Sequence, residues 1–213
     1  MSLQPEIEFY YSISSRYSYL ASTQIDSLES DTGCTVSWMP LDGWELRALA
    51  ASEPFQALPS GQYRSPYREQ DIQGWADYYG VPYREPPDAN SNIWWDGYDP
   101  RPLARAAVAA KRLGKGAVYS QHLYETFFAT DTWPVDDAVL ERVAAQAGLD
   151  AEEFARVFRE PETDVHVTEI AARAHRHGAF GIPTFVFRDR LFWGNDRIVL
   201  LKHHVARCLA EEK

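Results

Sequence analysis

The chain has 213 residues, enough for one domain with a sizeable core and for an inserted subdomain. It carries 31 acidic and 21 basic residues, a formal net charge of −10. This balance argues against a general surface for nucleic acid or anionic membranes, although it leaves room for a small anion site. No segment reads as a transmembrane span, and the N-terminus lacks the pattern of a signal peptide.

The chain contains only two cysteines, Cys34 and Cys208, which are far apart in the sequence. Neither belongs to a CxxC motif, so a redox-active dithiol is not expected. A disulfide framework is not expected either, and a reduced cytoplasmic setting fits best.

The first part of the chain predicts a strand, a helix and a second strand. An apolar and aromatic run over residues 6–13 predicts the first strand, and residues 17–30 predict the helix. Residues 35–39 alternate between the two faces of a second strand. This βαβ order implies a parallel pair of strands.

A polar break, Ser14-Ser15-Arg16, separates the first strand from the helix. Backbone N–H groups at a helix N-terminus are unpaired and favour an anion, and the Ser15 hydroxyl would face it. If the anion is a thiolate, such a site lowers the pKa of the thiol and produces a nucleophile. The alternative is that Ser14 or Ser15 only caps the helix, which the pattern alone favours.

The middle of the chain is predicted to be helical. Residues 44–77 have a helical composition that three prolines interrupt, and the clearest helix there covers residues 67–79. A proline-rich loop over residues 81–92 is a candidate for lining a site. Further helices are predicted over residues 100–113, 117–130, 135–147, 150–160 and 162–177.

The C-terminal part returns to strands. Residues 184–187 and 191–193 predict a hairpin, and residues 197–210 predict an amphipathic helix. The predicted fold class is therefore α/β, with a βαβ…ββα sheet domain interrupted by a large all-helical insertion. Residues 1–40 and 161–213 would form the sheet domain, and residues 41–160 the insertion.

Three stretches resemble the motifs of one protein family. Residues 9–21 read FYYSISSRYSYLA, similar to F-Y-F-D-F-x-S-P-Y-S-Y-L-A; residues 180–185 read FGIPTF, similar to F-G-V-P-T-F; residues 192–197 read FWGNDR, similar to W-x-G-N-D-R. A weaker match begins at Arg64. The chain thus resembles the 2-hydroxychromene-2-carboxylate isomerases, in the kappa-class glutathione transferase and DsbA-like branch of the thioredoxin superfamily.

The resemblance implies a thioredoxin-like sheet domain and a site for glutathione. Ser15 would be the catalytic residue, because it takes the place of the first cysteine of the dithiol relatives and would donate a hydrogen bond to the glutathione thiol. Pro183 would be a cis-proline, and the backbone of Ile182 would pair with glutathione as an added strand. From the residues alone, an equally good interpretation is that Pro183 only marks the start of an edge strand.

The resemblance assigns the rest of glutathione to two other places. Asn195 and Asp196 would hold its γ-glutamyl carboxylate and ammonium. Arg64 would replace the family's lysine and bind the glycine end or the substrate carboxylate. Without the resemblance, a helix cap explains the first two residues equally well, and a solvated surface charge is the default interpretation of Arg64.

Several residues depart from the family pattern. Ser12 replaces an aspartate, Gly74 replaces an arginine, and Arg16 replaces the proline after the catalytic serine. Arg16 would add a cation that stabilises the thiolate or binds an acidic substrate. Trp94 and Trp95 follow the proline-rich loop, where they belong to the core, to a dimer interface or to the wall of an aromatic substrate pocket.

The resemblance predicts a glutathione-dependent isomerase that acts on a small aromatic electrophile and forms a homodimer. Two alternatives remain: a kappa-like glutathione transferase that keeps the conjugate, and a non-catalytic thioredoxin-fold binding module. No metal site is expected, since the pairs His175 and His177, and His203 and His204, lack helical metal-ligand spacing.

Overall fold

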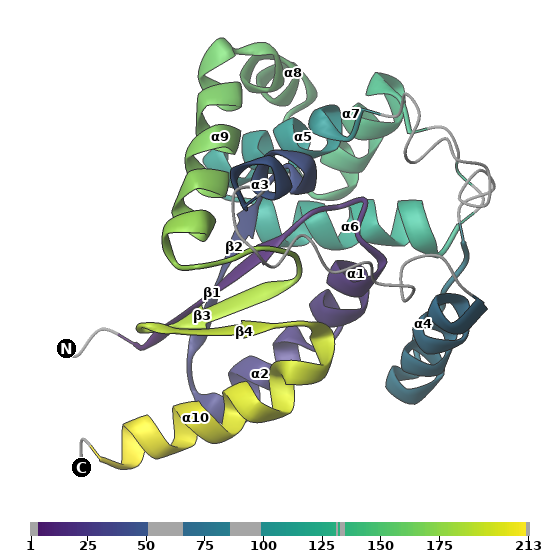
Figure 1. Ribbon diagram of the computed structural model, residues 1–213. Coiled ribbons are helices and arrows are strands. Elements are labelled where there is room, and N and C mark those ends of the chain that lie inside the picture. Colours follow the sequence, from purple (N-terminus) through teal and green to yellow (C-terminus); the bar gives the residue numbers. More distant parts are fainter. Residues whose placement is uncertain (1–3, 51–65, 86–98, 131, 133–134, 212–213) are drawn as a thin grey trace.

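The computed structural model describes residues 4–50, 66–85, 99–130, 132 and 135–211. Within these ranges four strands form one mixed sheet in the order β2-β1-β3-β4 (Figure 1). The strands are β1 (Glu6–Tyr11), β2 (Thr35–Pro40), β3 (Thr184–Phe187) and β4 (Arg190–Trp193). β1 runs parallel to β2, whereas β3 is antiparallel to both β1 and β4, which confirms the predicted sheet.

Helices make up most of the remaining described chain. They are α1 (Arg16–Ser22), α2 (Ile25–Thr32), α3 (Gly43–Leu49), α4 (Pro66–Tyr79), α5 (Arg101–Arg112), α6 (Gly116–Phe128), α7 (Asp137–Gln146), α8 (Ala151–Arg159), α9 (Pro161–Arg176), the 3-10 turn η5 (Asn195–Arg197) and α10 (Ile198–Ala210). In these described ranges, no helix combines the length and the apolar character needed to cross a membrane.

The two faces of the sheet are covered by different helices. Because successive side chains of a strand point to opposite faces, Ile7 and Phe9 pack with residues of α1, α2 and α10, whereas Tyr10 packs with residues of α3, α5 and α9. Figure 1 shows α2 and α10 on one side of the sheet and α3 and α9 on the other. The sheet is therefore the middle layer of the molecule.

Helix α5 connects the helical region to the sheet. Ala104 and Val108 on α5 pack with the sheet face that α9 covers, and Ala106 and Ala107 belong to the other buried cluster. The cluster that holds Ile7, Phe9, Ala106 and Ala107 also contains side chains of α6, α7 and α8. The sheet and these helices therefore share a continuous core. The division into residues 1–40 and 161–213 against 41–160 stays a prediction.

The prediction of one helix over residues 17–30 is wrong, because the helix is interrupted between α1 and α2. The Ser22 hydroxyl donates to the carbonyl of Tyr19 at 2.7 Å, and the Thr23 hydroxyl donates to the carbonyl of Leu20 at 2.8 Å. Such bonds compete with the helical ladder, which accounts for the break.

The first strand also ends earlier than its apolar pattern suggests, at Tyr11 rather than at residue 13. The amide of Ser15 donates to the carbonyl of Ser12 at 3.0 Å, so residues 12–15 turn away from the sheet. This turn brings Ser15 to the start of α1.

Candidate functional site

Four connections meet at one edge of the sheet. The register pairs Tyr11 with Pro40, Tyr10 with Thr184, and Thr184 with Trp193. The C-terminal ends of β1, β2 and β4 therefore lie beside the N-terminal end of β3. The connections that meet there cover residues 12–15, 41–43, 182–183 and 194–196, and they include five of the predicted site residues.

Ser15 is the N-cap of α1 and is partly exposed. Its side-chain oxygen accepts a hydrogen bond from the Ser18 amide at 3.2 Å, so the capping interpretation is confirmed. A hydroxyl has one donor and two acceptor lone pairs. The cap therefore leaves the O–H proton of Ser15 available to a second acceptor, and capping does not conflict with binding a thiolate.

The turn before Ser15 is supported from the helical region. The Tyr124 hydroxyl on α6 donates to the carbonyl of Ser12 at 3.1 Å, and the hydroxyls of Ser12 and Ser14 lie 3.1 Å apart. Burial raises the pKa of Tyr124 well above its usual value, which keeps this phenol protonated as a donor. Where the family pattern has an aspartate, this chain thus has a buried, uncharged hydroxyl.

The peptide bond between Ile182 and Pro183 is cis, as predicted. The Gly194 amide donates to the carbonyl of Pro183 at 2.9 Å, which ties this connection to the end of β4. The N–H and C=O of Ile182 form no hydrogen bond with any residue that the structure describes. Ile182 therefore presents one backbone donor and one backbone acceptor at this edge.

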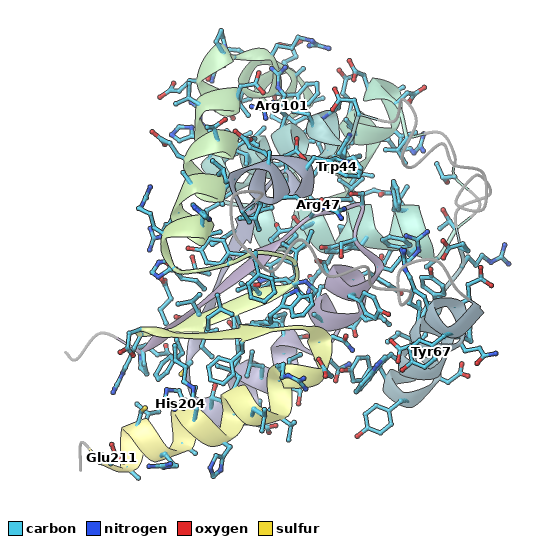
Figure 2. All side chains as sticks on the ribbon, in the orientation of Figure 1. Trp44, Arg47, Tyr67, Arg101, His204 and Glu211 are labelled. Atoms are coloured by element: carbon cyan, nitrogen blue, oxygen red, sulfur yellow. The ribbon has the colours of Figure 1, made fainter. Side chains whose placement is uncertain are left out.

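Two glycines allow close packing around Ile182. A Cβ on Gly43, the first residue of α3, would lie 3.1 Å from Cδ1 of Ile182, and a Cβ on Gly181 would lie 2.8 Å from Nε1 of Trp193. Trp44 follows on α3, with its ring centroid 5.6 Å from the guanidinium carbon of Arg47 (Figure 2). Trp44 is 39% exposed, so its ring lies at the surface of the chain beside this connection.

Asn195 and Asp196 lie in the 3-10 turn η5 rather than directly at the start of α10. Asn195 is buried, and its side-chain amide donates to the hydroxyl of Tyr79 on α4 at 3.3 Å. Asp196 forms an ion pair with Arg197 at 2.6 Å. The first N–H groups of this turn have no partner within the helix, as at any helix start.

Arg16 is directed toward Glu85. Its Nε lies 2.7 Å from one carboxylate oxygen of Glu85 and 2.9 Å from the other, and its Nη2 also contacts the carboxylate. The Tyr83 hydroxyl donates to the same carboxylate. The Arg16 side chain is only 11% exposed, so this cation is held in a half-buried ion pair beside Ser15.

Three predicted site residues, Arg64, Trp94 and Trp95, lie outside the described residues. Three further residues at this edge were not predicted from the sequence: Tyr79 on α4 and Tyr124 on α6 contact the connections, and Glu85 contacts Arg16. None of the three belongs to a motif, and only the folded chain brings them to this edge. For Gly43 there was one signal, a glycine soon after the second predicted strand.

Comparison with known proteins places the chain in a family. Residues 6–206 match the DSBA-like thioredoxin domain, and the chain belongs to that family. Proteins named 2-hydroxychromene-2-carboxylate isomerase are similar to it along nearly the whole chain. The one from Sphingobium xenophagum is 26% identical over 93% of this chain and 97% of its own length. The one from Pseudomonas putida is 24% identical over 94% of both chains. These relatives confirm the resemblance seen in the motifs.

Solved structures agree on the fold. A 2-hydroxychromene-2-carboxylate isomerase superposes with a TM-score of 0.80 at 22% identity, covering 97% of both chains. The cytosolic disulfide reductase DsbM from Pseudomonas aeruginosa, solved with GSH, has a TM-score of 0.62 at 21% identity, covering 97% of this chain and 98% of its own. The fold is therefore the DsbA-like thioredoxin fold.

Proposed function

We propose that this protein is a glutathione-dependent isomerase of the 2-hydroxychromene-2-carboxylate type. The relatives that bear this name support the reaction class, and the reductase solved with GSH supports the ligand. The observation that carries the proposal lies in the chain itself. The partly exposed hydroxyl of Ser15 lies at the same edge of the sheet as the backbone of Ile182, which pairs with none of the described residues.

These groups fit a tripeptide thiol. The N–H and C=O of Ile182 provide the donor and acceptor that pairing with an extended peptide needs. The O–H of Ser15 can donate to the sulfur, and a hydrogen bond to the charged form lowers the thiol pKa. The first N–H groups of η5 can hold the γ-glutamyl carboxylate, while Asp196, shared with Arg197, meets the ammonium.

When bound, glutathione supplies a thiolate that adds reversibly to a conjugated aromatic carboxylate and leaves after a bond has rotated, so that it is not consumed. The chain holds the sulfur at Ser15 and binds the peptide backbone at Ile182. In the proposal Arg64 binds the glycine end or the substrate carboxylate, Trp94 and Trp95 wall the aromatic pocket, and two copies form a homodimer.

The protein's own thiols lie away from this edge. Cys34 is buried just before β2, whose other end reaches the site, and Cys208 is near the C-terminal end of α10, whose first turns follow η5. Dithiol exchange of the kind that disulfide oxidoreductases perform therefore has no cysteine at Ser15 to start from.

Titration calorimetry with glutathione tests the proposal in wild-type protein, Ser15→Ala and Asp150→Ala. Asp150 caps α8 through the Glu153 amide at 2.9 Å, so Asp150→Ala controls for the loss of a helix cap. Ultraviolet absorbance of the thiolate reports the pKa of the bound thiol. We expect binding by all three proteins and a lowered thiol pKa in all but Ser15→Ala.

A turnover assay separates the alternatives. An isomerase converts 2-hydroxychromene-2-carboxylate and returns the glutathione, whereas a kappa-like transferase accumulates a conjugate. Glutathione binding without turnover of any electrophile indicates a binding module. Absence of glutathione binding by folded wild-type protein contradicts the proposed function.

A further inference from the structure

Arg16 forms an ion pair with Glu85 next to the candidate site, and no motif in the sequence predicts this contact. Arg16 directly follows Ser15 and is the first residue of α1, and Glu85 lies after α4, 69 residues away. The contact is bidentate and the guanidinium is nearly covered, so the pair is a fixed feature rather than a transient surface contact.

The segment that carries Glu85 is itself held in place. The Tyr19 hydroxyl donates to the carbonyl of Pro82 at 2.5 Å, and the Arg84 amide donates to the carbonyl of Phe128 at 2.6 Å. Glu85 therefore meets Arg16 from a segment anchored to α1 and α6. Its carboxylate is positioned independently of any bound ligand.

The pair balances its own charge. Burial by itself raises the pKa of Glu85, but the hydrogen bonds and the charge of Arg16 outweigh it, and the net pKa is lowered. The Glu85 carboxylate is thus ionised at neutral pH, and the pair carries no net charge beside Ser15. A lone arginine at this position would favour an anion at the neighbouring hydroxyl.

Other charged and titratable groups face this pair. Arg68 on α4 lies near enough that burial and the charge of Arg16 lower the pKa of Arg68. Burial and Glu85 raise the pKa of Tyr83, so its phenol stays a neutral donor. The Tyr17 hydroxyl donates to Asp71 at 2.8 Å, which places a second carboxylate nearby.

We propose that Glu85 is a positioning residue that pairs with Arg16, offsets its charge beside Ser15 and so limits how strongly the site stabilises a thiolate. This inference rests on the proposed function, because it assumes that a thiolate binds at Ser15. It gives opposite signs for the two partners: loss of Glu85 leaves a surplus cation, and loss of Arg16 leaves a surplus anion.

The test places a reporter thiol at the site with Ser15→Cys and measures its pKa by ultraviolet absorbance, with wild-type protein subtracted for Cys34 and Cys208. Adding Glu85→Gln should lower this pKa, and adding Arg16→Gln should raise it. Each shift should be on the order of one unit, as for a unit charge about 10 Å away at an effective dielectric constant of about 20. With both substitutions the pKa should return to that of Ser15→Cys alone.

Two further variants separate charge from structure. Arg16→Lys keeps the charge without the fork, so it should leave the reporter pKa nearly unchanged and serves if Arg16→Gln does not fold. Glu160→Gln removes one of the two carboxylate partners of Arg112 near the α8–α9 junction and should leave the pKa of the reporter thiol unchanged. Shifts of the same sign for Glu85→Gln and Arg16→Gln, or no shift, overturn the inference. The titration uses no glutathione, so its result is separate from the test of the proposed function.

Discussion

The hydroxyl of Tyr124 donates a hydrogen bond to the main-chain carbonyl of Ser12 across 112 positions of sequence, at 3.1 Å. The same carbonyl accepts from the Ser15 amide at 3.0 Å. One oxygen atom therefore joins α6 to the turn that presents Ser15. Because carbonyl oxygens have two lone pairs, both bonds form at once. The helical region thereby fixes the position of the candidate catalytic hydroxyl.

Tyr124→Phe should loosen this turn. It removes a buried hydrogen bond, and the free energy of unfolding measured with urea should fall by about 1–2 kcal/mol. Glutathione affinity should fall as well, because Ser15 would be less rigidly placed. Tyr119→Phe is the matched control, since the Tyr119 hydroxyl on the same helix donates to the carbonyl of Leu140 at 3.3 Å, away from the site. Equal losses of affinity in both variants would contradict the role given to Tyr124.

Gly181→Ala should disturb the connection before β3. The added Cβ would lie 2.8 Å from Nε1 of Trp193, closer than real contacts allow, so the indole or the backbone next to Ile182 must move. We expect a loss of about 1–3 kcal/mol in unfolding free energy and weaker glutathione binding. Gly74→Ala in the middle of α4 meets no atom within 4 Å and should raise stability by up to about 1 kcal/mol, with unchanged binding. If Gly181→Ala raised the free energy of unfolding and Gly74→Ala lowered it, the close contact with Trp193 would not be what restricts residue 181 to glycine.

The local pattern of the chain predicts much of this fold. Alternation in residues 35–39 and the amphipathic segment before Ala210 predicted a strand and the last helix, because burial on one face leaves a periodic pattern. The strand at residues 184–187 was predicted from a short apolar run, and all four of its residues are buried. The helix predicted to begin at Asp150 does begin there, because the Asp150 carboxylate caps it by accepting from the Glu153 amide. The break between α1 and α2 was missed, because it depends on two hydroxyls that bond back to carbonyls rather than on a proline or glycine.

The site was only partly predictable, and for a different reason. The cis bond at Pro183 followed from a motif, which needs no knowledge of the rest of the chain. Arg16 was expected to act as a cation at the site, but its partner Glu85 sits in a proline-rich segment with no periodic signal. Contacts between residues so far apart in sequence appear only once the chain has folded, and the same holds for Tyr79 and Asn195.

The free energy of unfolding at acid pH should depend on the charge of Glu85. Its pKa is lowered in the folded protein, so the ionised carboxylate contributes stability above the ordinary glutamate pKa, and this contribution is lost as pH falls through the folded pKa. Urea unfolding from about pH 7 to about pH 3 should show a flatter acid limb for Glu85→Gln than for wild type. At neutral pH the variant should be less stable by about 1–3 kcal/mol, because Arg16 loses its charge-assisted hydrogen bonds to this carboxylate. Glu152→Gln, an exposed change on α8, should keep the wild-type curve; an unchanged limb in Glu85→Gln would mean that Glu85 does not carry this dependence.

Tyr79→Phe should weaken the link between α4 and the turn η5. The Tyr79 hydroxyl accepts from the side-chain amide of Asn195 at 3.3 Å and donates to the main-chain carbonyl of Asn195 at 3.4 Å. Both hydrogen bonds are long. The cost in unfolding free energy should therefore be small, about 0.5–1 kcal/mol. Because η5 is proposed to hold the γ-glutamyl end, glutathione affinity measured by calorimetry should fall by up to about fivefold. Tyr78→Phe is the control. The Tyr78 side chain is 79% exposed, so this substitution should alter neither stability nor affinity. If Tyr79→Phe lowers stability while affinity stays at the wild-type value, η5 does not bind glutathione and the γ-glutamyl end must lie elsewhere.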